Sequence, residues 1–416
     1  MDPDRPPDRR AAWLTLAAFS FLTTLGNTAH AAWPTLETSV AEAQRRSEGV
    51  VRAEAEVTVA RAGQLGAKVS KFGNPYLDLQ VDRGSTTKDV QALAYLYTPM
   101  EIFGQRGARM NEAEAMKHWR DVGLSDAKSV ATGQVIQSYG SILVAAERLA
   151  IAEKGEQSAR AEASYFEGRF AAQDATVYDR SLAQAELSRW LQTKAEAILK
   201  LTDAKVTLMR LTGNTAWNEP ATSIAPMPPA LRHDWSKGYM AQAAQKSPAL
   251  RSTRAESAYW EQNKKRWQAE RRMPIELLLI AGRGDPGDLR LGGGLLIQIP
   301  VFRRFQGDIA KAEAEQAYVQ QIQPVIRTTV EARLEGSRLA LVSMLEALQN
   351  LDSYGIPAGE KAVEASFESY KRGKIDLLQV LLARRELALA KSRRLDLLES
   401  AWRAYADLAA VSGDWP

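Results

Sequence analysis

The side chains that most often carry chemistry in proteins are scarce in this chain of 416 residues. It has no cysteine, and beyond residue 31 it has two histidines, His118 and His233. His118 lies in the charged segment KHWRD and His233 in a proline-rich stretch, and neither has a recognisable ligand partner nearby. No HExxH, GxSxG or CxxC motif occurs. We therefore expect no enzymatic activity, no cofactor and no metal site.

Three consecutive glycines, Gly292 to Gly294, are the segment that could cradle a phosphate. A phosphate loop needs a helix that begins directly after the glycines, and no helix start follows here. The surrounding residues, about 289–300, are typical of a strand. We therefore expect a strand in which backbones pack closely or the sheet bends.

Two short segments combine a tyrosine, a glycine three residues later and then a cation: YFEGRF at 165–170 and YKRGKI at 370–375. They belong to a duplication with a spacing of about 200 residues. The same duplication relates FGNPYLDLQV to RRMPIELLLI, and YTPMEIFGQRGARMNEAEA to IQIPVFRRFQGDIAKAEAE. A repeat this long predicts that each half of the chain builds the same supersecondary unit.

The unit reads as helix, two strands, long helix, turn and return helix. In the first half, 32–213, we expect a helix over 36–70 and strands at about 75–83 and 91–99. A helix from about 104 to 167 follows, is broken by Gly168, and returns to about 211. The first strand alternates strictly between apolar and polar residues, so one of its faces is apolar and the other polar.

The second half, 236–416, repeats this plan after a proline-rich connector at 214–235. Its strands are expected at about 274–282 and 289–300. Its long helix has possible interruptions at Pro324 and at 355–357, and Gly373 makes the turn. Each half therefore contributes two strands and a long helical hairpin.

The N-terminal residues 1–31 resemble a secretory signal peptide, with Arg9 and Arg10 before an apolar run and Ala29-His30-Ala31 as a cleavage sequence. After residue 31 no apolar run approaches the roughly 20 residues of a membrane helix. An exported chain of this kind is either free in the periplasm or inserted into a membrane as β-strands. The charges are mixed in sign along the chain, so nothing indicates nucleic acid as a partner.

Four amphipathic strands cannot close a membrane barrel, since bacterial outer-membrane barrels have at least about eight. Three chains together would supply twelve strands and leave no unpaired edge. The helices, much longer than the strands, would then extend from one end of the barrel as a tube. The residues therefore favour a homotrimeric β-barrel continued by a helical barrel.

In its repeat, strand pairs and long helices the chain resembles the TolC-like outer-membrane efflux channels over about 36–413. The segments PMEIFGQRGAR (99–109), IPVFRRFQGDIAKAEAE (299–315) and the stretch 369–398 are most similar to the branch that serves heavy-metal cation exporters. The resemblance implies a trimer with a 12-stranded barrel in the outer membrane and an α-barrel in the periplasm. It also implies a periplasmic adaptor protein and an inner-membrane pump, often of the resistance-nodulation-division type, as partners.

The resemblance further implies roles for particular residues. The two glycine turns correspond to the periplasmic tips that meet the adaptor, with Tyr165, Gly168, Arg169, Tyr370, Gly373 and Lys374. An acidic constriction of some relatives corresponds to Asp174 in the first turn and to Gln379 in the second, where Asp376 is a possible substitute. Pro99 and Pro300 correspond to the transitions from sheet to helix, because proline lacks the N–H that a strand ladder needs.

Other classes of protein are less consistent with these patterns. A soluble periplasmic coiled-coil scaffold or adaptor would explain the helices and the signal peptide, but not a strand pair in each repeat. Within the channel class, drugs or a secreted protein are alternatives to metal cations, because the pump is a different chain and selects the cargo.

Overall fold

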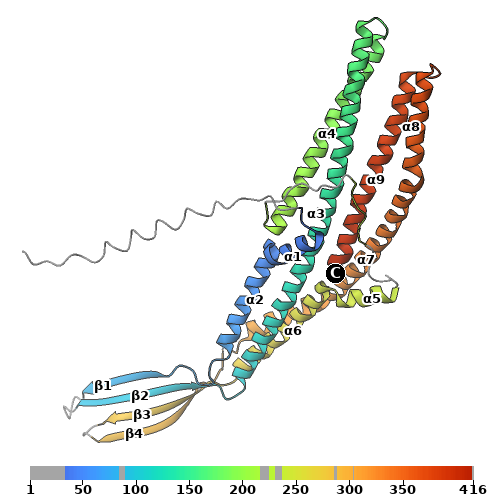
Figure 1. Ribbon diagram of the computed structural model, residues 1–416. Helices are drawn as coiled ribbons and strands as arrows, with labels where there is room; N and C mark the ends of the chain where they lie inside the picture. The colour runs from blue at the N-terminus through green and yellow to red at the C-terminus, as the bar shows by residue number, and fades with distance from the viewer. Residues whose placement is uncertain are drawn as a thin grey trace, which may run out of the picture.

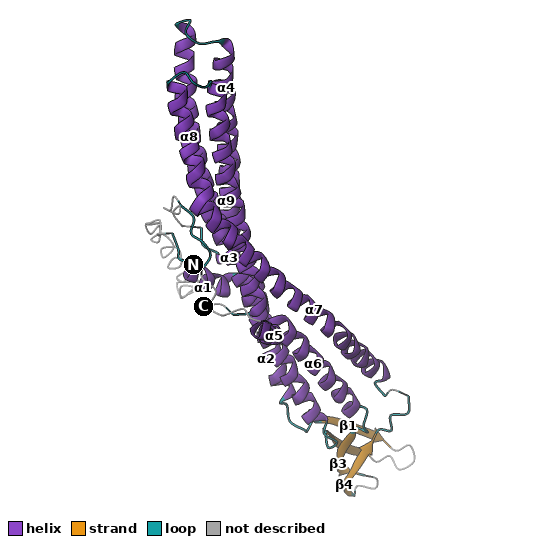
Figure 2. Cartoon of the chain, turned by 90° about the vertical axis from the view of Figure 1, so that its right-hand side faces the viewer, coloured by secondary structure: helices purple, strands orange, loops and turns teal. Residues whose placement is uncertain are grey.

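The computed structural model describes residues 33–83, 90–215, 224–229, 237–284, 288–302 and 304–414. The molecule is elongated, with a β-sheet at one end and two helical hairpins at the other (Figure 1). The ends of the described chain lie near the middle of its length (Figure 2). The proposed signal peptide and most of the connector, including His233, are outside the described residues.

The first repeat contains four helices and two strands. They are α1 (Leu36–Arg46), α2 (Glu48–Ala67), β1 (Tyr76–Arg83), β2 (Val90–Met100), α3 (Gln105–Ala171) and α4 (Val177–Thr212). The 67 residues of α3 span about 100 Å at 1.5 Å per residue, and they carry the chain from the sheet to the far tip.

The second repeat has the same order with one addition, a π-helical turn within its long helix. Its elements are α5 (Lys237–Lys246), α6 (Pro248–Glu270), β3 (Ile275–Arg283), β4 (Leu289–Ile297), α7 (Gln306–Asn350), η1 (Leu351–Gly355), α8 (Ile356–Lys371) and α9 (Leu377–Ser412). The first three strands match the predicted ranges to within one or two residues, whereas β4 ends at Ile297, before the predicted 300.

The helices predicted at 36–70 and from 236 are each divided at a serine. Ser47 separates α1 from α2 and Ser247 separates α5 from α6, both with extended backbone angles and both buried. Pro248 explains the second break, since proline disfavours the helical conformation in the residue before it. The prediction of unbroken helices was therefore wrong. The breaks occur at equivalent positions, 200 residues apart.

The π-helical turn η1 ends two residues before Pro357. Proline cannot donate a helical hydrogen bond, and its ring clashes with the carbonyl four residues earlier. The wider turn accommodates this: the amide of Ile356 donates to the carbonyl of Leu351, five residues back. The predicted interruption at 355–357 is thus a local widening, and α8 continues to the tip. Pro324 lies inside α7 without ending it.

The sheet has the strand order β1-β2-β3-β4, with every neighbouring pair antiparallel. Tyr76 lies opposite Tyr97, Tyr97 opposite Leu278, and Leu278 opposite Gly294. The middle pair, β2 with β3, joins the two repeats. The outer strands β1 and β4 are the edges of the sheet in the described chain.

The hydrophobic core lies at the middle of the molecule, where α3, α4 and α9 pack together with α1 and α7. Its largest fully buried side chains include Ile136, Ile142, Leu208, Leu334, Leu398 and Leu408. Among the described helices, only α3 has an apolar window long enough to cross a membrane, and 56% of that window is buried inside the molecule. This window is a core segment that packs against other helices.

Candidate functional site: two helical turns and an amphipathic sheet

The turn that joins α3 to α4 and the turn that joins α8 to α9 have the same pattern of backbone hydrogen bonds. In the first, the amide of Asp174 donates to the carbonyl of Arg169 at 2.8 Å; in the second, Lys374 donates to Ser369 at 3.0 Å. A second hydrogen bond inside each turn spans three residues: the amide of Gln173 donates to the carbonyl of Phe170, and the amide of Gly373 to that of Tyr370. Equivalent residues are again 200 positions apart.

This equivalence corrects the sequence comparison of the two turns. Gly168 does not break α3 but lies within its last turn, and α3 continues to Ala171. The left-handed residue of the first turn is Gln173, with φ of 61°, and its counterpart is Gly373, with φ of 68°. Aligning Gly168 with Gly373 was therefore wrong by five residues.

The other residues of the two turns shift accordingly. Tyr370 is equivalent to Phe170 and not to Tyr165. Lys374 is equivalent to Asp174, and Gln379 to Asp179. Asp174 therefore has a cation as its structural counterpart.

Charged side chains at the first turn are paired with one another. The guanidinium of Arg169 contacts the carboxylate of Asp174 at 2.8 Å and lies 5.7 Å from the ring of Tyr165. The hydrogen bond to Asp174 raises the pKa of Arg169. Arg180 lies 4.1 Å from the ring of Phe170, and its guanidinium is 3.7 Å from Glu167.

The helices that return from the tips begin with side-chain caps. Thr176 and Asp179 form a reciprocal capping box at the start of α4. Asp376 caps α9 by accepting a hydrogen bond from the amide of Gln379 at 3.0 Å. A capping carboxylate stabilises a helix by about 1 kcal/mol. Asp376 therefore stabilises the start of α9. Roles of Asp174, Asp376 and Gln379 in a constriction of the pore stay predictions.

At the opposite end of the molecule, the register of the sheet separates an apolar face from a polar one. Residues sharing the apolar face include Leu77, Leu79, Val81, Leu96, Leu277, Leu279, Leu291 and Leu295. The charged residues on it, Arg83 and Arg283, are the last residues of β1 and β3, at the end away from the helices.

The other face of the sheet carries polar and aromatic side chains, among them Asp78, Gln80, Asp82, Tyr95, Tyr97, Glu276 and Arg290. Leu93, Leu278, Ile280 and Leu296 also lie on it. The hydroxyl of Tyr76 donates to Glu276 at 2.7 Å, and its ring stacks on Tyr97 at 4.7 Å between centroids. Gly292 and Gly294 also lie on this face and add no side chain to it between Arg290 and Leu296 of β4. The triple glycine is thus part of a strand, as expected.

The two prolines lie close to the transitions from sheet to helix. Pro99 is the second-last residue of β2, and its carbonyl accepts a hydrogen bond from the amide of Gly73 at 2.8 Å. Pro300 lies beyond the end of β4, and its carbonyl accepts from the guanidinium of Arg304 at 2.9 Å. The strand pairing continues past Pro99 to Met100, and the role of the two prolines in the transitions stays a prediction.

Sequence reasoning missed a charged cluster near the middle of the molecule. Arg394 of α9 donates to Asp352 of η1 at 2.6 Å and to Glu147 of α3 at 3.1 Å. Glu147 also accepts from the amide of Ala225 in the connector at 2.8 Å. The cluster ties both repeats and the connector together. Pro357 was the available signal, because it creates the π-helical turn that presents Asp352.

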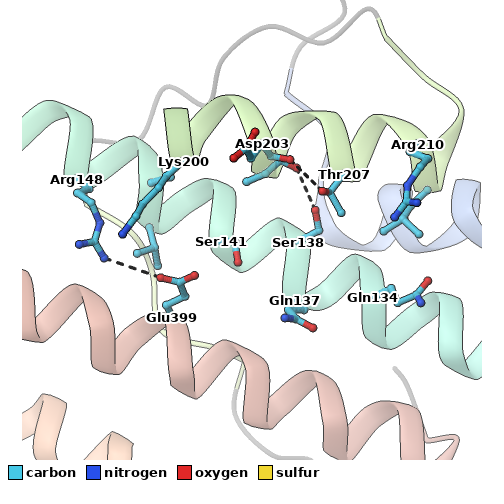
Figure 3. Close-up of a pocket in the computed structure, with 14 residues that line it drawn as sticks. Gln134, Gln137, Ser138, Ser141, Arg148, Lys200, Asp203, Thr207, Arg210 and Glu399 are labelled. Carbon is cyan, nitrogen blue, oxygen red and sulfur yellow. Dashed lines mark hydrogen bonds and ion pairs between the residues drawn. The ribbon is translucent and has the colours of Figure 1, made fainter. Parts of the chain in front are cut away.

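A groove of about 420 Å³ between α3, α4 and α9 has polar walls (Figure 3). Two of its hydroxyls donate to backbone carbonyls: that of Ser138 to Ala204 and that of Thr207 to Asp203. Arg148 lies 3.9 Å from Glu399 across the groove. No group of three or more metal-ligating side chains occurs within the described ranges.

The comparisons with known proteins agree with this geometry. No protein-family model matches the chain. The crystal structure of the transmembrane channel CusC has a TM-score of 0.74 at 16% identity and covers 90% of this chain and 92% of its own. The Campylobacter jejuni outer-membrane channel CmeC has a TM-score of 0.74 at 14% identity, over 91% of this chain and 85% of its own.

The fold is therefore that of the TolC-like outer-membrane channels, in agreement with the resemblance in the sequence. The solved relatives are channels and not enzymes. In sequence, the chain is 27% identical to the cobalt-zinc-cadmium resistance protein CzcC of Cupriavidus metallidurans over 391 residues, 91% of this chain and 90% of CzcC.

Proposed function

We propose that this chain is the outer-membrane exit duct of a tripartite efflux system, and that it conducts cargo without chemistry of its own. The observation that carries the proposal is the continuous apolar face of the sheet at one end of the molecule. Leu79 on this face is 67% exposed and Leu291 is 73% exposed in the single chain. An apolar surface of this kind is stable against lipid but not against water.

The unpaired edges of the sheet support a homotrimer. The backbone groups of β1 and β4 along the edges have no partner strand in the described chain. Pairing β4 of one copy with β1 of the next would satisfy them, and three copies would close a barrel of twelve strands. The polar face with Asp78, Gln80 and Asp82 would then line a water-filled lumen.

The opposite end of the molecule would lie in the periplasm. The two hairpins extend away from the sheet on the long helices, and their turns form the far tips (Figure 1). We place the contact with a periplasmic adaptor at these turns. An inner-membrane pump of the resistance-nodulation-division type would lie beyond the adaptor. Tyr165, Arg169, Tyr370, Gly373 and Lys374 are the candidates for this contact.

For the cargo, we propose heavy-metal cations. The support is the similarity to CzcC, whose name refers to cobalt, zinc and cadmium resistance, over nine-tenths of both chains. A wide duct need not ligate its cargo, so the lack of cysteine is compatible with metal export.

The test is deletion of the chain in its own host, followed by growth on zinc, cobalt, cadmium, copper and a panel of drugs. We expect loss of metal tolerance that returns with a plasmid copy. Sensitivity to drugs alone would replace the metal cargo with drugs, and a block in the release of a secreted protein would indicate a secretion channel.

Cell fractionation tests the class of protein itself. We expect the chain in the outer membrane, released only by detergent and with a migration that changes on heating. Recovery in the soluble periplasmic fraction would instead favour a coiled-coil scaffold or adaptor.

A further inference from the structure

The two tips of one chain share their backbone but differ in charge. Over 167–180, the first hairpin has two cations and three carboxylates, whereas 367–380 has three cations and two carboxylates. Because equivalent backbone hydrogen bonds hold both turns, a partner would meet two surfaces of similar shape and opposite net charge. The difference therefore resides in the side chains.

The charges of the first tip are compensated within the tip. Arg169 is bound by Asp174, Arg180 approaches Glu167, and Asp179 is occupied in the capping box. A partner that bound these groups would first have to separate them. An exposed ion pair already satisfied in this way offers little net attraction.

The second tip has two cations with no such compensation. Arg372 and Lys374 flank Gly373 at the end of the hairpin, and both are exposed. Lys371 is paired with Glu368 at 3.0 Å, and Asp376 caps α9, so the nearby carboxylates are engaged. No hydrogen bond or ion pair joins the side chain of Arg372 or Lys374 to another described residue.

We propose that Arg372 and Lys374 form an electrostatic docking site for an acidic segment of the periplasmic adaptor, and that the second tip rather than the first selects the partner by charge. The inference rests on the proposed function, since it names the chemistry of the adaptor expected there. Complementary charges at the rim of an interface raise the rate of association and exclude partners of the wrong sign. In a trimer the site would occur three times around the tube.

A charge-reversed variant tests the site in cells that depend on the chain. The reversal is Arg372→Glu with Lys374→Glu, and a milder variant replaces both with glutamine. The matched control is Ala172→Glu, which adds an acid at the position of the first tip equivalent to Arg372. All three changes are at exposed turn residues, and circular dichroism with heat-dependent migration verifies folding and assembly.

We expect the reversal to reduce metal tolerance towards that of the deletion strain, the glutamine variant to have an intermediate effect, and the control to keep full tolerance. An acid-to-lysine change in the adaptor should restore export to the reversed channel. Full tolerance in the reversed strain would overturn this inference alone. Full tolerance in a strain without the chain would contradict the proposed function itself.

Binding is measured on the purified full chain in detergent. Because the chain has no cysteine, Glu364→Cys supplies a single site for a fluorophore beside the second tip. The probes are two helical hairpin peptides that differ only in glutamates or lysines beside their loop. We expect the glutamate peptide to bind, more weakly as salt rises, and about tenfold more weakly to the reversed variant.

Equal binding of the two peptides would overturn the docking site, as would binding of the glutamate peptide that is unchanged by the reversal. Phosphatidylglycerol vesicles are the remaining probe. If they bind through Arg372 and Lys374 and the glutamate peptide does not, the cations recognise an anionic membrane surface and the inference is wrong.

Discussion

Gly140 of α3 lies directly beneath the indole of Trp402 of α9, so that a Cβ atom at residue 140 would come within 2.3 Å of the ring. Trp402 is buried, and its ring N–H donates to the carbonyl of Pro226 in the connector at 3.1 Å. The glycine therefore lets one side chain join both repeats and the segment between them.

Gly140→Ala should destabilise the protein, because a methyl group has no space under the ring. Forced overpacking of this kind costs about 1–3 kcal/mol. Gly123→Ala in the same helix is the control, since nothing lies within 4 Å of its Cβ position and alanine favours the helix. Thermal unfolding followed by circular dichroism should show a lower midpoint for the first variant only; equal midpoints would contradict the packing.

Removing Arg394 should weaken the contact between the repeats. Arg394→Met leaves the carboxylates of Glu147 and Asp352 without their shared cation, and a half-removed buried pair costs about 3–5 kcal/mol. Arg52→Met is the control, because its partner Glu48 and its own side chain are largely exposed. Thermal midpoints of both variants are compared. Adding Glu147→Gln to Arg394→Met should recover part of the loss.

Exchanging the left-handed residues of the two turns should have opposite effects. Gln173→Gly removes the strain of a side chain at φ of 61° and should stabilise the first turn by about 1 kcal/mol. Gly373→Gln introduces that strain at φ of 68° and should destabilise the second turn by a similar amount. Thermal unfolding measures both, and a shift in the same direction for both variants would rule out the equivalence of the turns.

A charge on the apolar face of the sheet should prevent assembly in the membrane. Arginine facing lipid near the midplane costs about 2–4 kcal/mol, so Leu79→Arg should reduce the amount of chain in the outer-membrane fraction. Gln80→Arg, the next residue, lies on the polar face and should assemble normally. If the two variants assemble equally well, the apolar face does not contact lipid.

Asp126 of α3 should make stability depend on pH. Burial raises the pKa of its carboxyl, so the charged form disfavours folding at neutral pH. This penalty disappears as pH falls through the raised pKa, where the folded protein takes up a proton more readily than the unfolded chain. Asp126→Asn should therefore raise the thermal midpoint at pH 7, and the difference from the wild type should shrink towards pH 4. A difference in thermal midpoint that grows as the pH falls would contradict this prediction.

Much of the fold could be predicted from local patterns. The alternation of Leu77, Leu79 and Val81 with polar residues placed β1 and its two faces, because side chains in a strand alternate regardless of what lies beyond. The duplication predicted the same elements in each half. The divisions at Ser47 and Ser247 were missed: the segments around Ser47 are good helix formers, and the signal that Pro248 gives for the break at Ser247 was not used.

The candidate site was predicted less well, and the first turn shows why. The three-residue spacing of Tyr165 and Gly168 is the same as that of Tyr370 and Gly373. However, α3 continues past Gly168, and the residue with left-handed backbone angles is Gln173. The turn begins after Ala171, and Thr176 and Asp179 cap the helix that follows it.

The sequence by itself determined the repeat, the order of the elements and the apolar face of the sheet, because these follow from periodicity along the chain. Only the tertiary structure decided which residues of the two tips are equivalent, that Arg394 joins Glu147 to Asp352, and that the tips differ in unpaired charge. The contacts of Arg394 join segments far apart in the sequence, and no local pattern specifies which partner its side chain will meet. The tips depend on the backbone hydrogen bonds and side-chain pairs that form within each turn, which the spacing of tyrosine and glycine does not specify.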